Sequence, residues 1–528
     1  MDKIKLILTI IAVVVAIILV AGFFIVKSLL ASFDQIAMQY DNEVITAYQR
    51  ELDYTPFDLD TFDKYEEIDT LITVASAEKI QEMIVSNKFT TVDLVKYYIT
   101  RIKKYEEYNT VIQLNPKALE EAKAIDESIA NGELKALHSV CFLIKDNISA
   151  VNMNSAAGAY ALRDVTTSRD AFIVQTIKEQ DGIILGKANL SEWSNFMSQP
   201  SSNGYSVLGG QTKNAYGKFD VGGSSSGPSA AAALNLATVT IGTETAGSLI
   251  YPAGQNSVIT LKPTMGLLSR DLIIPISEAQ DTAGVISRSV SDLNQIFNVL
   301  VKEDFNDHAS VIAKDYTPEV SLDKNYLSGK RVGVVDASSE ETQKVIEQLK
   351  QIGATVVEIS LDEKVNEVDM MSVLNYGMVH DVNAYLNHEA VLSNFKSLKA
   401  IVEFNKSNPD VMPYEQALLE GALSATLSKE EVDTIIANNK KVTSEALVKA
   451  FVEYEIDVIL SMSNELSGVY AACGYPALTV PAGYRESGEP YGLTFVGKYL
   501  DDQELIKLAY SYEQHTLVRK VPANSSNQ

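Results

Sequence analysis

The spacing of apolar residues predicts a chain in which helices alternate with strands. Ile80, Met83 and Ile84 recur at intervals of three and four residues, which is the spacing of one face of an α-helix. Thr90 has the form of an N-cap that opens a second helix with an acidic residue in its first turn. A third helix is predicted for PKALEEAKAIDESIANG, which ends at Gly132, a typical C-cap residue.

Short apolar runs bounded by polar or glycine-rich segments predict buried strands. One such run lies in LHSVCFLIKDNIS, and others lie in DVILSMS, YPALTVPAG and YGLTFVGK. FIVQTIKEQDGIILGKANLSEW has the pattern of a helix followed by a strand, and GKRVGVVDASSEETQKVIEQLKQIGATVVEIS that of strand, helix, strand. QELIKLAYSYEQHT is predicted to close the chain as a helix. Because strands and helices alternate, the chain is assigned to the α/β class.

Residues 71–520 are predicted to form one large domain. A chain of 528 residues is long enough for one large domain or for two to three ordinary ones, but no internal repeat or linker composition interrupts it after residue 70. Within the domain, residues 360–450 have helical patterns without glycine-rich punctuation, and we expect them to help shape a pocket. The tail, residues 521–528, is predicted to be disordered.

Residues 1–27 are predicted to form a membrane anchor. Residues 6–26 are twenty-one uncharged residues, and a helix of that length spans about 31 Å, close to the hydrocarbon thickness of a bilayer. The alternatives are a cleaved signal peptide, whose apolar run is usually only about 7–15 residues long, and a buried core helix. Residues 28–70 are acidic and aromatic, and we interpret them as a stalk or N-terminal extension that packs on the body.

The charges that flank the apolar segment indicate its orientation. Lys3 and Lys5 precede the segment, and Lys27 follows it. The positive-inside rule therefore favours a cytoplasmic N-terminus. We expect a single-pass membrane protein with its large domain on the extracytoplasmic side.

The composition argues against several classes of function. Hydrophobic residues make up 46% of the chain and charged residues 21%, which is typical of a globular protein. Two cysteines cannot build a disulfide framework, and five scattered histidines form no metal-binding motif, so we expect no metal. The formal net charge of −25 repels phosphate backbones and argues against nucleic acid as a partner.

Lys145 stands out because it directly follows the apolar run Val140–Ile144. A lysine at a strand end commonly extends its ammonium group to water, or it can pair with a neighbouring acid such as Asp146. The alternative is a neutral lysine that acts as a base. A lysine with its ordinary pKa of about 10.4 is charged at pH 7, but burial can lower that pKa far enough to neutralise the side chain.

Two loops rich in glycine, serine and threonine carry candidate nucleophiles. GGSSSG contains Ser224, Ser225 and Ser226, and GTETAGS ends at Ser248. Taken singly, each loop could be an ordinary turn. Taken together they favour an active site, because a serine hydroxyl needs a nearby base to act as a nucleophile. Residues 245–248 could also direct successive backbone N–H groups to one point, as an oxyanion hole requires.

Several sequence motifs occur in an order that is typical of one protein family. FLIKDNI precedes GGSSSGPSAAAA, which precedes IGTETAGSLIYPA and LKPTMG. KANLSEWSNF lies between the first two of these motifs, and PALTVPAG follows the last. In these motifs the chain resembles the amidase signature family over about residues 75–520. It is most similar to the branch with GTET in place of the commoner GTD, which includes peptide amidases.

The resemblance implies a fold and a mechanism. The fold would be a large α/β domain with a central mixed β-sheet covered by helices, here preceded by the anchor. Family members hydrolyse linear amides through a Ser–cis-Ser–Lys triad and an acyl-enzyme, without a cofactor, and release ammonia or an amine. By this resemblance Ser248 is the nucleophile, Ser224 is the serine on a cis peptide bond, and Lys145 is the base. The backbone N–H groups of the oxyanion hole would be those of Thr245, Ala246, Gly247 and Ser248.

The chain departs from the family pattern at a few positions. Glu244 replaces a frequent aspartate, as it does in the GTET branch. None of the departures removes a catalytic group, and we expect the remaining ones to bear on specificity or rate. These are Ala246, Ile250, Ser139, Cys141 and Thr260.

Three alternatives compete with an amidase. Gly223–Gly227 fits the G-x-S-x-G elbow of α/β-hydrolases, although the preceding NAYGKFDV does not resemble a buried strand. S-x-x-K, as in penicillin-binding proteins, occurs at Ser321–Lys324 and Ser393–Lys396, but K-T-G does not occur. The third alternative is a membrane-tethered, catalytically weak binding protein on an amidase scaffold. For the amidase, the substrate would be a small-molecule or peptide amide.

Overall fold

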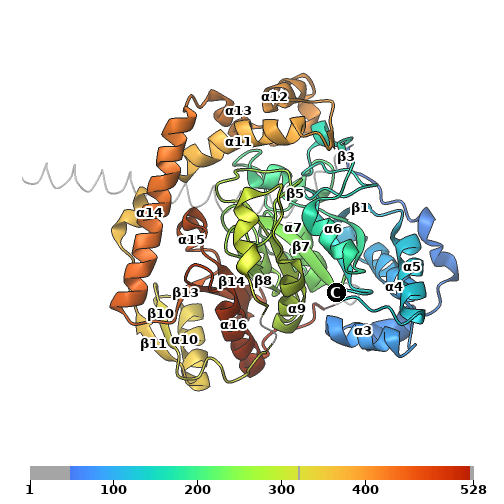
Figure 1. Cartoon of the computed structure of the whole chain (residues 1–528), viewed down its shortest axis with the longest axis horizontal. Coiled ribbons are helices and arrows are strands. Elements are labelled where there is room, and N and C mark those ends of the chain that lie inside the picture. Colours follow the sequence, from blue (N-terminus) through green and yellow to red (C-terminus); the bar gives the residue numbers. More distant parts are fainter. Residues whose placement is uncertain (1–47, 319–320, 524–528) are drawn as a thin grey trace, which may run out of the picture. The chain divides into compact units, whose positions relative to one another are not determined.

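A mixed sheet of eleven strands forms the centre of the molecule (Figure 1). The computed structural model describes residues 48–318 and 321–523. In spatial order the strands are β1 (Val111–Leu114), β4 (Ile183–Ala188), β2 (Cys141–Lys145), β7 (Val239–Glu244), β9 (Thr282–Ser287), β8 (Ile259–Lys262), β14 (Ala477–Tyr484), β15 (Pro490–Val496), β13 (Val458–Met462), β10 (Arg331–Val334) and β11 (Thr355–Glu358). β2 is parallel to β4 and β7, whereas β7 and β9 are antiparallel. The predicted α/β class with a mixed sheet is confirmed.

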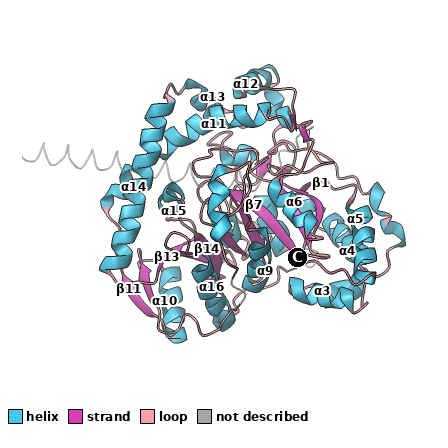
Figure 2. Cartoon of the chain, in the orientation of Figure 1, coloured by secondary structure: helices cyan, strands magenta, loops and turns pink. Residues whose placement is uncertain are grey.

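Helices cover the sheet (Figure 2). In chain order the α-helices are α2 (Tyr65–Ile72), α3 (Ala77–Val85), α4 (Thr91–Lys104), α5 (Ala118–Ala130), α6 (Phe172–Glu179), α7 (Ser226–Ala233), α8 (Ile250–Gln255), α9 (Val290–Leu300), α10 (Glu340–Ile352), α11 (Met370–Asn387), α12 (Leu398–Ser407), α13 (Ala417–Ser424), α14 (Lys429–Glu453), α15 (Ser467–Cys473) and α16 (Asp502–Thr516). The predicted caps are confirmed at α4, where Thr90 forms a capping box with Asp93. After α5 the chain turns at Gly132, which has a φ of 80°.

The alternation of side chains along β2 divides the core into two layers. Phe142 and Ile144 pack in a cluster with residues of α6, α9 and α16. Cys141 and Leu143 face the opposite way and pack with residues of α4, α5 and α7. Because successive side chains of a strand point to opposite faces, Lys145 lies on the same face as Cys141 and Leu143. This places it on the face that α7 and the glycine/serine loop before it cover.

The helical stretch predicted for residues 360–450 is confirmed and consists of α11, α12, α13 and α14. α11, α12 and α13 lie at the top of the view in Figure 1, and α14 runs down its left side. A small antiparallel sheet of β12 (Val391–Leu392) and β3 (Thr166–Thr167) joins this segment to the body. A second small sheet, of β5 (Tyr205–Ser206) and β6 (Gly210–Gln211), lies in the body.

The described part of the predicted N-terminal extension packs on the body. Phe57 and Ile68 are buried in the same cluster as residues of α4. Arg101 of α4 also forms an ion pair with Asp69, with 2.7 Å between Nη1 and Oδ1. Residues 48–70 therefore share the core of the large domain.

The predicted anchor, residues 1–27, lies outside the described residues, as do residues 28–47 of the extension and residues 524–528 of the tail. Among the helices within residues 48–318 and 321–523, none is long and apolar enough to cross a membrane.

Gly227 allows α7 to approach the loop after β4 very closely. A Cβ atom at this position would lie 2.2 Å from the Asn189 carbonyl oxygen and 2.6 Å from the Asn189 nitrogen, both of them backbone atoms. We expect Gly227→Ala to lower the free energy of unfolding by about 1–3 kcal/mol or more, because overpacking forces the backbone to move. Thermal unfolding measures this effect.

Gly421 in α13 provides the matched control, because a Cβ there meets no atom within 4 Å. Gly421→Ala is expected to leave stability unchanged or to raise it by up to about 1 kcal/mol, since alanine favours helix. Equal melting temperatures for Gly227→Ala and the unmodified protein would contradict the packing argument.

Candidate active site

Lys145 lies at the end of β2 and is completely buried. Its Nζ donates to Ser224 Oγ at 2.8 Å and to Ser225 Oγ at 3.1 Å. The same nitrogen lies 2.9 Å from Thr243 Oγ1 and 3.1 Å from the Thr243 carbonyl oxygen. The interpretation of Lys145 as a strand-end lysine that reaches water is therefore wrong.

Asp146 pairs with a different buried lysine, Lys187 on β4. Asp146 Oδ1 lies 3.7 Å from Lys187 Nζ, and Asp146 Oδ2 accepts a hydrogen bond from the Gly158 N–H at 2.9 Å. The proposed pairing of Lys145 with Asp146 is therefore wrong as well. Lys187 was missed by the sequence analysis, although a lysine inside the apolar run IILGKA is a signal of the same kind as Lys145.

Burial changes the protonation of Lys145. It lowers the pKa of the Lys145 amine to about 7, and the negative charges of Asp281 and Glu244 oppose this shift only in part. The hydrogen-bond partners of the amine are hydroxyl and carbonyl oxygens, so no carboxylate is bonded to it directly. An uncharged amine is therefore well populated near neutral pH, as a general base requires.

The glycine/serine loop brings Ser224 to Lys145. Ser224 is completely buried, and the peptide bond between Gly223 and Ser224 is cis. The Ser225 N–H donates to the Ser248 carbonyl oxygen at 3.1 Å, so the two predicted loops lie against each other. Ser248 is 8% exposed, which leaves its side chain partly accessible where Ser224 is not.

The α/β-hydrolase alternative places its nucleophile at Ser225, and the structure does not support it. The hydroxyl of Ser225 donates to the Thr243 carbonyl oxygen at 2.9 Å and is completely buried. The strand that precedes the motif in the chain, β6, ends at Gln211 and does not lead directly into Gly223. This alternative is wrong because the strand-to-helix elbow that it requires is missing from the described residues.

Glu244 shapes the loop that carries Ser248. Its Oε1 accepts a hydrogen bond from the Gly247 N–H at 2.7 Å. Its Oε2 accepts from the N–H groups of Leu249 at 2.7 Å and Ile250 at 3.1 Å. The prediction that Gly247 offers its N–H to an oxyanion is wrong in this conformation, because the Glu244 carboxylate already accepts from it.

The other three predicted oxyanion donors remain open. Within the residues that the structure describes, the backbone N–H groups of Thr245, Ala246 and Ser248 have no hydrogen-bond acceptor. Backbone N–H groups without an intramolecular acceptor are the donors that an oxyanion hole requires.

Asp281 fixes the far side of this loop. Its Oδ1 accepts a hydrogen bond from Thr245 Oγ1 at 2.5 Å, and its Oδ2 accepts from the backbone N–H groups of Ile276 at 2.8 Å and Ser277 at 3.0 Å. Burial raises the pKa of the Asp281 carboxyl to about 6. The sequence analysis missed Asp281, because no pattern in ISEAQDTAG connects it with the loop GTETAGS.

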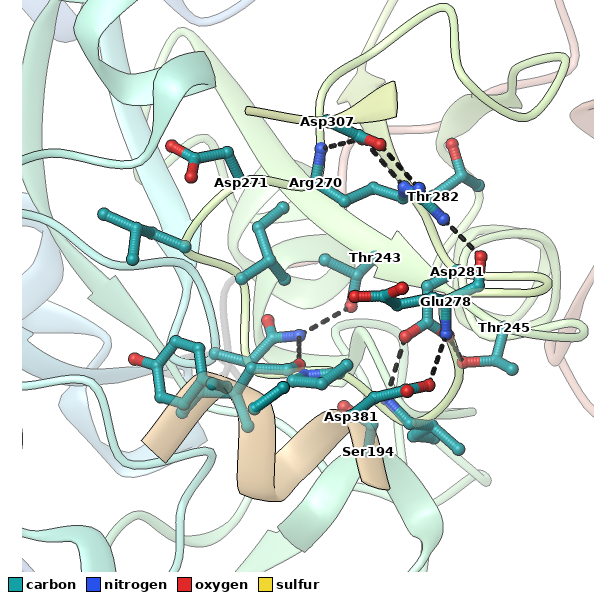
Figure 3. A pocket seen from close by; sticks show the side chains of 18 of the residues that line it. Ser194, Thr243, Thr245, Arg270, Asp271, Glu278, Asp281, Thr282, Asp307 and Asp381 are labelled. Carbon is teal, nitrogen blue, oxygen red and sulfur yellow. Dashed lines mark hydrogen bonds and ion pairs between the residues drawn. The ribbon is translucent and has the colours of Figure 1, made fainter. Parts of the chain in front are cut away.

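A cavity of about 180 Å³ adjoins this cluster. Thr243 of β7, Thr245 of the loop that follows it and Asp381 of α11 line this cavity (Figure 3). Its lining also includes Tyr385 of α11 and His388, which follows α11. Part of the segment 360–450 therefore lines this cavity.

Most of the unusual residues of the family motifs serve packing or local hydrogen bonding. Ser139 Oγ lies 2.7 Å from Thr91 Oγ1, and Thr260 Oγ1 donates to the Val285 carbonyl oxygen at 2.8 Å. Cys141 and Ile250 are completely buried in apolar clusters. Ala246 differs from these because it lies on the turn that carries the open N–H groups.

Known proteins are similar to this chain in sequence and in fold. The family model described as Amidase matches residues 93–467. A probable amidase of Arabidopsis thaliana is 34% identical over 472 residues, which cover 85% of this chain and 92% of that protein. The structure of an amidase family protein from Bacillus anthracis has a TM-score of 0.83 at 33% identity, and covers 93% of this chain and 98% of its own. The structure of the peptide amidase of Stenotrophomonas maltophilia has a TM-score of 0.80 at 33% identity, and the match covers 86% of this chain and 99% of that chain.

These similarities place the protein among the amidohydrolases. The chain belongs to the amidase family, since the family model covers more than half of it and the relative from Arabidopsis thaliana matches most of both chains.

Glu244→Gln is expected to lower both activity and stability. One amide oxygen cannot accept from all three backbone N–H groups that the two carboxylate oxygens hold, and a buried N–H without a partner costs about 1–3 kcal/mol. Because the loop that carries Ser248 would shift, we expect kcat to fall by about 10²-fold. Steady-state kinetics and the melting temperature measure the two effects.

Glu192→Gln is the control for this substitution. Glu192 is also buried, but among the described residues its carboxylate accepts only the Val207 N–H, at 2.9 Å, and a glutamine oxygen can keep that bond. Equal kcat values for Glu244→Gln and Glu192→Gln would contradict the role of Glu244 in holding the loop.

Proposed function

We propose that the protein hydrolyses the C–N bond of linear amides through Ser248, Ser224 and Lys145, with an acyl-enzyme intermediate. The observation that carries the proposal is the completely buried amine of Lys145, which lies 2.8 Å from Ser224 Oγ and has a pKa lowered to about 7. A lysine in this state can accept a proton near neutral pH. Ser248 lies on the adjacent loop, next to three open N–H groups.

The proposed reaction moves one proton along the three side chains. Ser248 Oγ attacks the amide carbonyl carbon while its proton passes to Ser224 and the proton of Ser224 passes to neutral Lys145. The oxyanion that forms accepts hydrogen bonds from the N–H groups of Thr245, Ala246 and Ser248. Lys145 then returns the proton through Ser224 to the leaving nitrogen, the C–N bond breaks, and ammonia or an amine departs. Water hydrolyses the remaining ester by the same relay, and no cofactor takes part.

The substrate is proposed to be a small-molecule or peptide amide. The similarity to the peptide amidase of Stenotrophomonas maltophilia, at 33% identity over 86% of this chain, supports a peptide amide among these. The hydrolysis test is ammonia release from a panel of amino-acid and peptide amides, with Ser248→Ala as the inactive control. Turnover of no amide by the folded protein would contradict the proposal.

We also propose that residues 6–26 anchor the protein in a membrane as a single span, with the large domain on the extracytoplasmic side. The uncharged apolar run and the lysines before it support this proposal. Deletion of residues 1–27 is expected to move the protein from the membrane fraction to the soluble fraction. Protease added outside intact cells is expected to cleave the full-length protein, and complete protection would contradict the orientation.

A further inference from the structure

The cavity beside the oxyanion loop is lined by an excess of carboxylates. Its lining includes one arginine, one histidine and five acids from three segments, and its volume of about 180 Å³ corresponds to roughly six water molecules of about 30 Å³ each. That space fits an alkyl chain of a few carbons with a charged end. Because Thr245 lies in both the lining and the oxyanion loop, a group in the cavity would lie close to the scissile bond.

Two of the acids in the lining are already neutralised. Asp307 binds the guanidinium of Arg270 through two bonds, with 2.8 Å between Nε and Oδ2 and 2.6 Å between Nη2 and Oδ1. The third nitrogen of Arg270 donates to the Glu278 carbonyl oxygen. Asp271 is bound in the same bidentate manner by Arg169. These pairs contribute no net charge to the cavity.

The other three acids have no cationic partner among the described residues: Glu278, Asp281 and Asp381. Figure 3 shows Asp381, on α11, pointing toward the loop that carries Glu278 and Asp281. Burial is the main cause that raises the pKa of Asp381 to about 7, and the charges of Glu278 and Asp281 add to it. His388 supplies no counter-charge through Nδ1, because that atom accepts the Ala390 N–H at 3.1 Å.

Asn147 gives independent evidence that the cavity binds a ligand with a hydrogen-bond donor. Its side chain is buried, with 2% exposed, and lines the cavity. Its Nδ2 donates to Thr243 Oγ1 at 3.1 Å and to the Ile274 carbonyl oxygen at 3.4 Å, which fixes the orientation of the amide. Its Oδ1 is left buried without a hydrogen-bond partner in the described part of the chain, and a buried acceptor of this kind is costly unless a ligand satisfies it.

We propose that this cavity binds an ammonium or guanidinium group of the substrate, so that the enzyme prefers amides that carry a positive charge near the scissile bond. A cation with several N–H donors satisfies both the three carboxylates and the free oxygen of Asn147. A metal ion does not fit, because no three Asp, Glu, His or Cys side chains converge as ligands among the residues described. The inference rests on the proposed hydrolysis of amides and names its substrate class: amides of basic amino acids or peptides.

Matched substrates and one variant test this inference. We would measure kcat/KM of the full-length protein at pH 8 for Nα-acetyl-lysinamide, Nα-acetyl-argininamide and the neutral Nα-acetyl-norleucinamide. At that pH the Asp381 and Asp281 carboxyls, with pKa values raised to about 7 and about 6, are ionised. The variant is Asp381→Asn, whose amide oxygen can still accept the Glu278 N–H that Asp381 accepts at 2.8 Å. The matched control is Asp410→Asn on the exposed surface.

The unmodified protein is expected to cleave at least one basic amide at least about tenfold faster than the neutral one, since desolvated charge pairs contribute strongly to binding. Asp381→Asn is expected to remove most of that preference by lowering only the rate for the basic amide, and Asp410→Asn to change neither rate. Equal rates for basic and neutral amides, or an equal loss for both in Asp381→Asn, would overturn the inference and leave the proposed hydrolysis intact. Failure to hydrolyse any amide would overturn the proposed function and this inference with it.

Discussion

Replacing Ser248 by alanine is expected to lower kcat by about six orders of magnitude, as loss of the nucleophile does in serine hydrolases. The variant keeps the backbone N–H groups of the loop but has no oxygen to form the acyl-enzyme. Because Ser248 is nearly buried and its side chain is small, the fold should be unchanged. Ammonia release under single-turnover and steady-state conditions measures the loss.

Ser229→Ala is the control for the loss of a buried serine hydroxyl. Ser229 lies on α7, close in sequence to Ser224, and its hydroxyl has no hydrogen-bond partner within the described chain. Its replacement is expected to leave kcat within about twofold of the unmodified protein, as for substitutions that break no bond. A Ser248→Ala protein with the activity of Ser229→Ala would exclude Ser248 as the nucleophile.

Replacing Lys145 by methionine is expected to lower kcat by about four orders of magnitude or more, because the proton relay then has no base. In the unmodified protein, the neutral amine is the active form, and burial lowers its pKa to about 7. Activity should therefore fall about tenfold per pH unit as the pH drops below 7, and should level off above it. A pH profile of kcat/KM measures the pH at which this fall, the acidic limb of the profile, begins.

Lys262→Met is the control that separates the loss of the catalytic base from the general effect of removing a buried lysine. Lys262 is also completely buried, and it donates to the carbonyl oxygens of Pro263 at 2.9 Å and Tyr475 at 2.8 Å. The variant is expected to be less stable, but its remaining activity should still show the acidic limb near pH 7. Disappearance of that limb in Lys262→Met, or its persistence in Lys145→Met, would contradict the assignment of Lys145.

Local patterns predicted the elements of the fold but not their arrangement. The apolar run before Lys145 and the capping signal at Thr90 depend on neighbours in sequence, and both predictions hold. The order of strands in the sheet depends on pairings between distant segments. β14, for example, lies between β8 and β15, and nothing in YPALTVPAG specifies β8 as a neighbour.

The site was predictable where a family motif specified the residue. The motifs led to Lys145, Ser224 and Ser248, and the structure places Lys145 against Ser224 and the Ser224 loop against the Ser248 loop. The motif could not show that the Gly247 N–H is occupied, because its acceptor is a side chain whose direction depends on the folded loop. The pairing of Lys187 with Asp146 was not predictable either, because it depends on β2 and β4 lying side by side in the sheet.

The negative charge of the cavity could not be predicted from the sequence. Asp381 and Glu278 are 103 residues apart in the chain and meet because α11 packs over the loop before β9. Isolated acids in a chain with a net charge of −25 carry no signal of their own. Their significance depends on which of them already have a cation, and this is a property of the folded structure alone.

The most direct test of the proposed mechanism is the mass of the full-length protein, and of its peptides, after reaction with an alkyl fluorophosphonate. This reagent forms a bond from an activated serine oxygen to phosphorus as fluoride leaves. We expect one adduct per chain, on the peptide that contains Ser248, no adduct in Ser248→Ala, and greatly slowed labelling in Lys145→Met. An adduct that persists in Ser248→Ala, or labelling of Lys145→Met at the unmodified rate, would contradict a serine activated by this lysine.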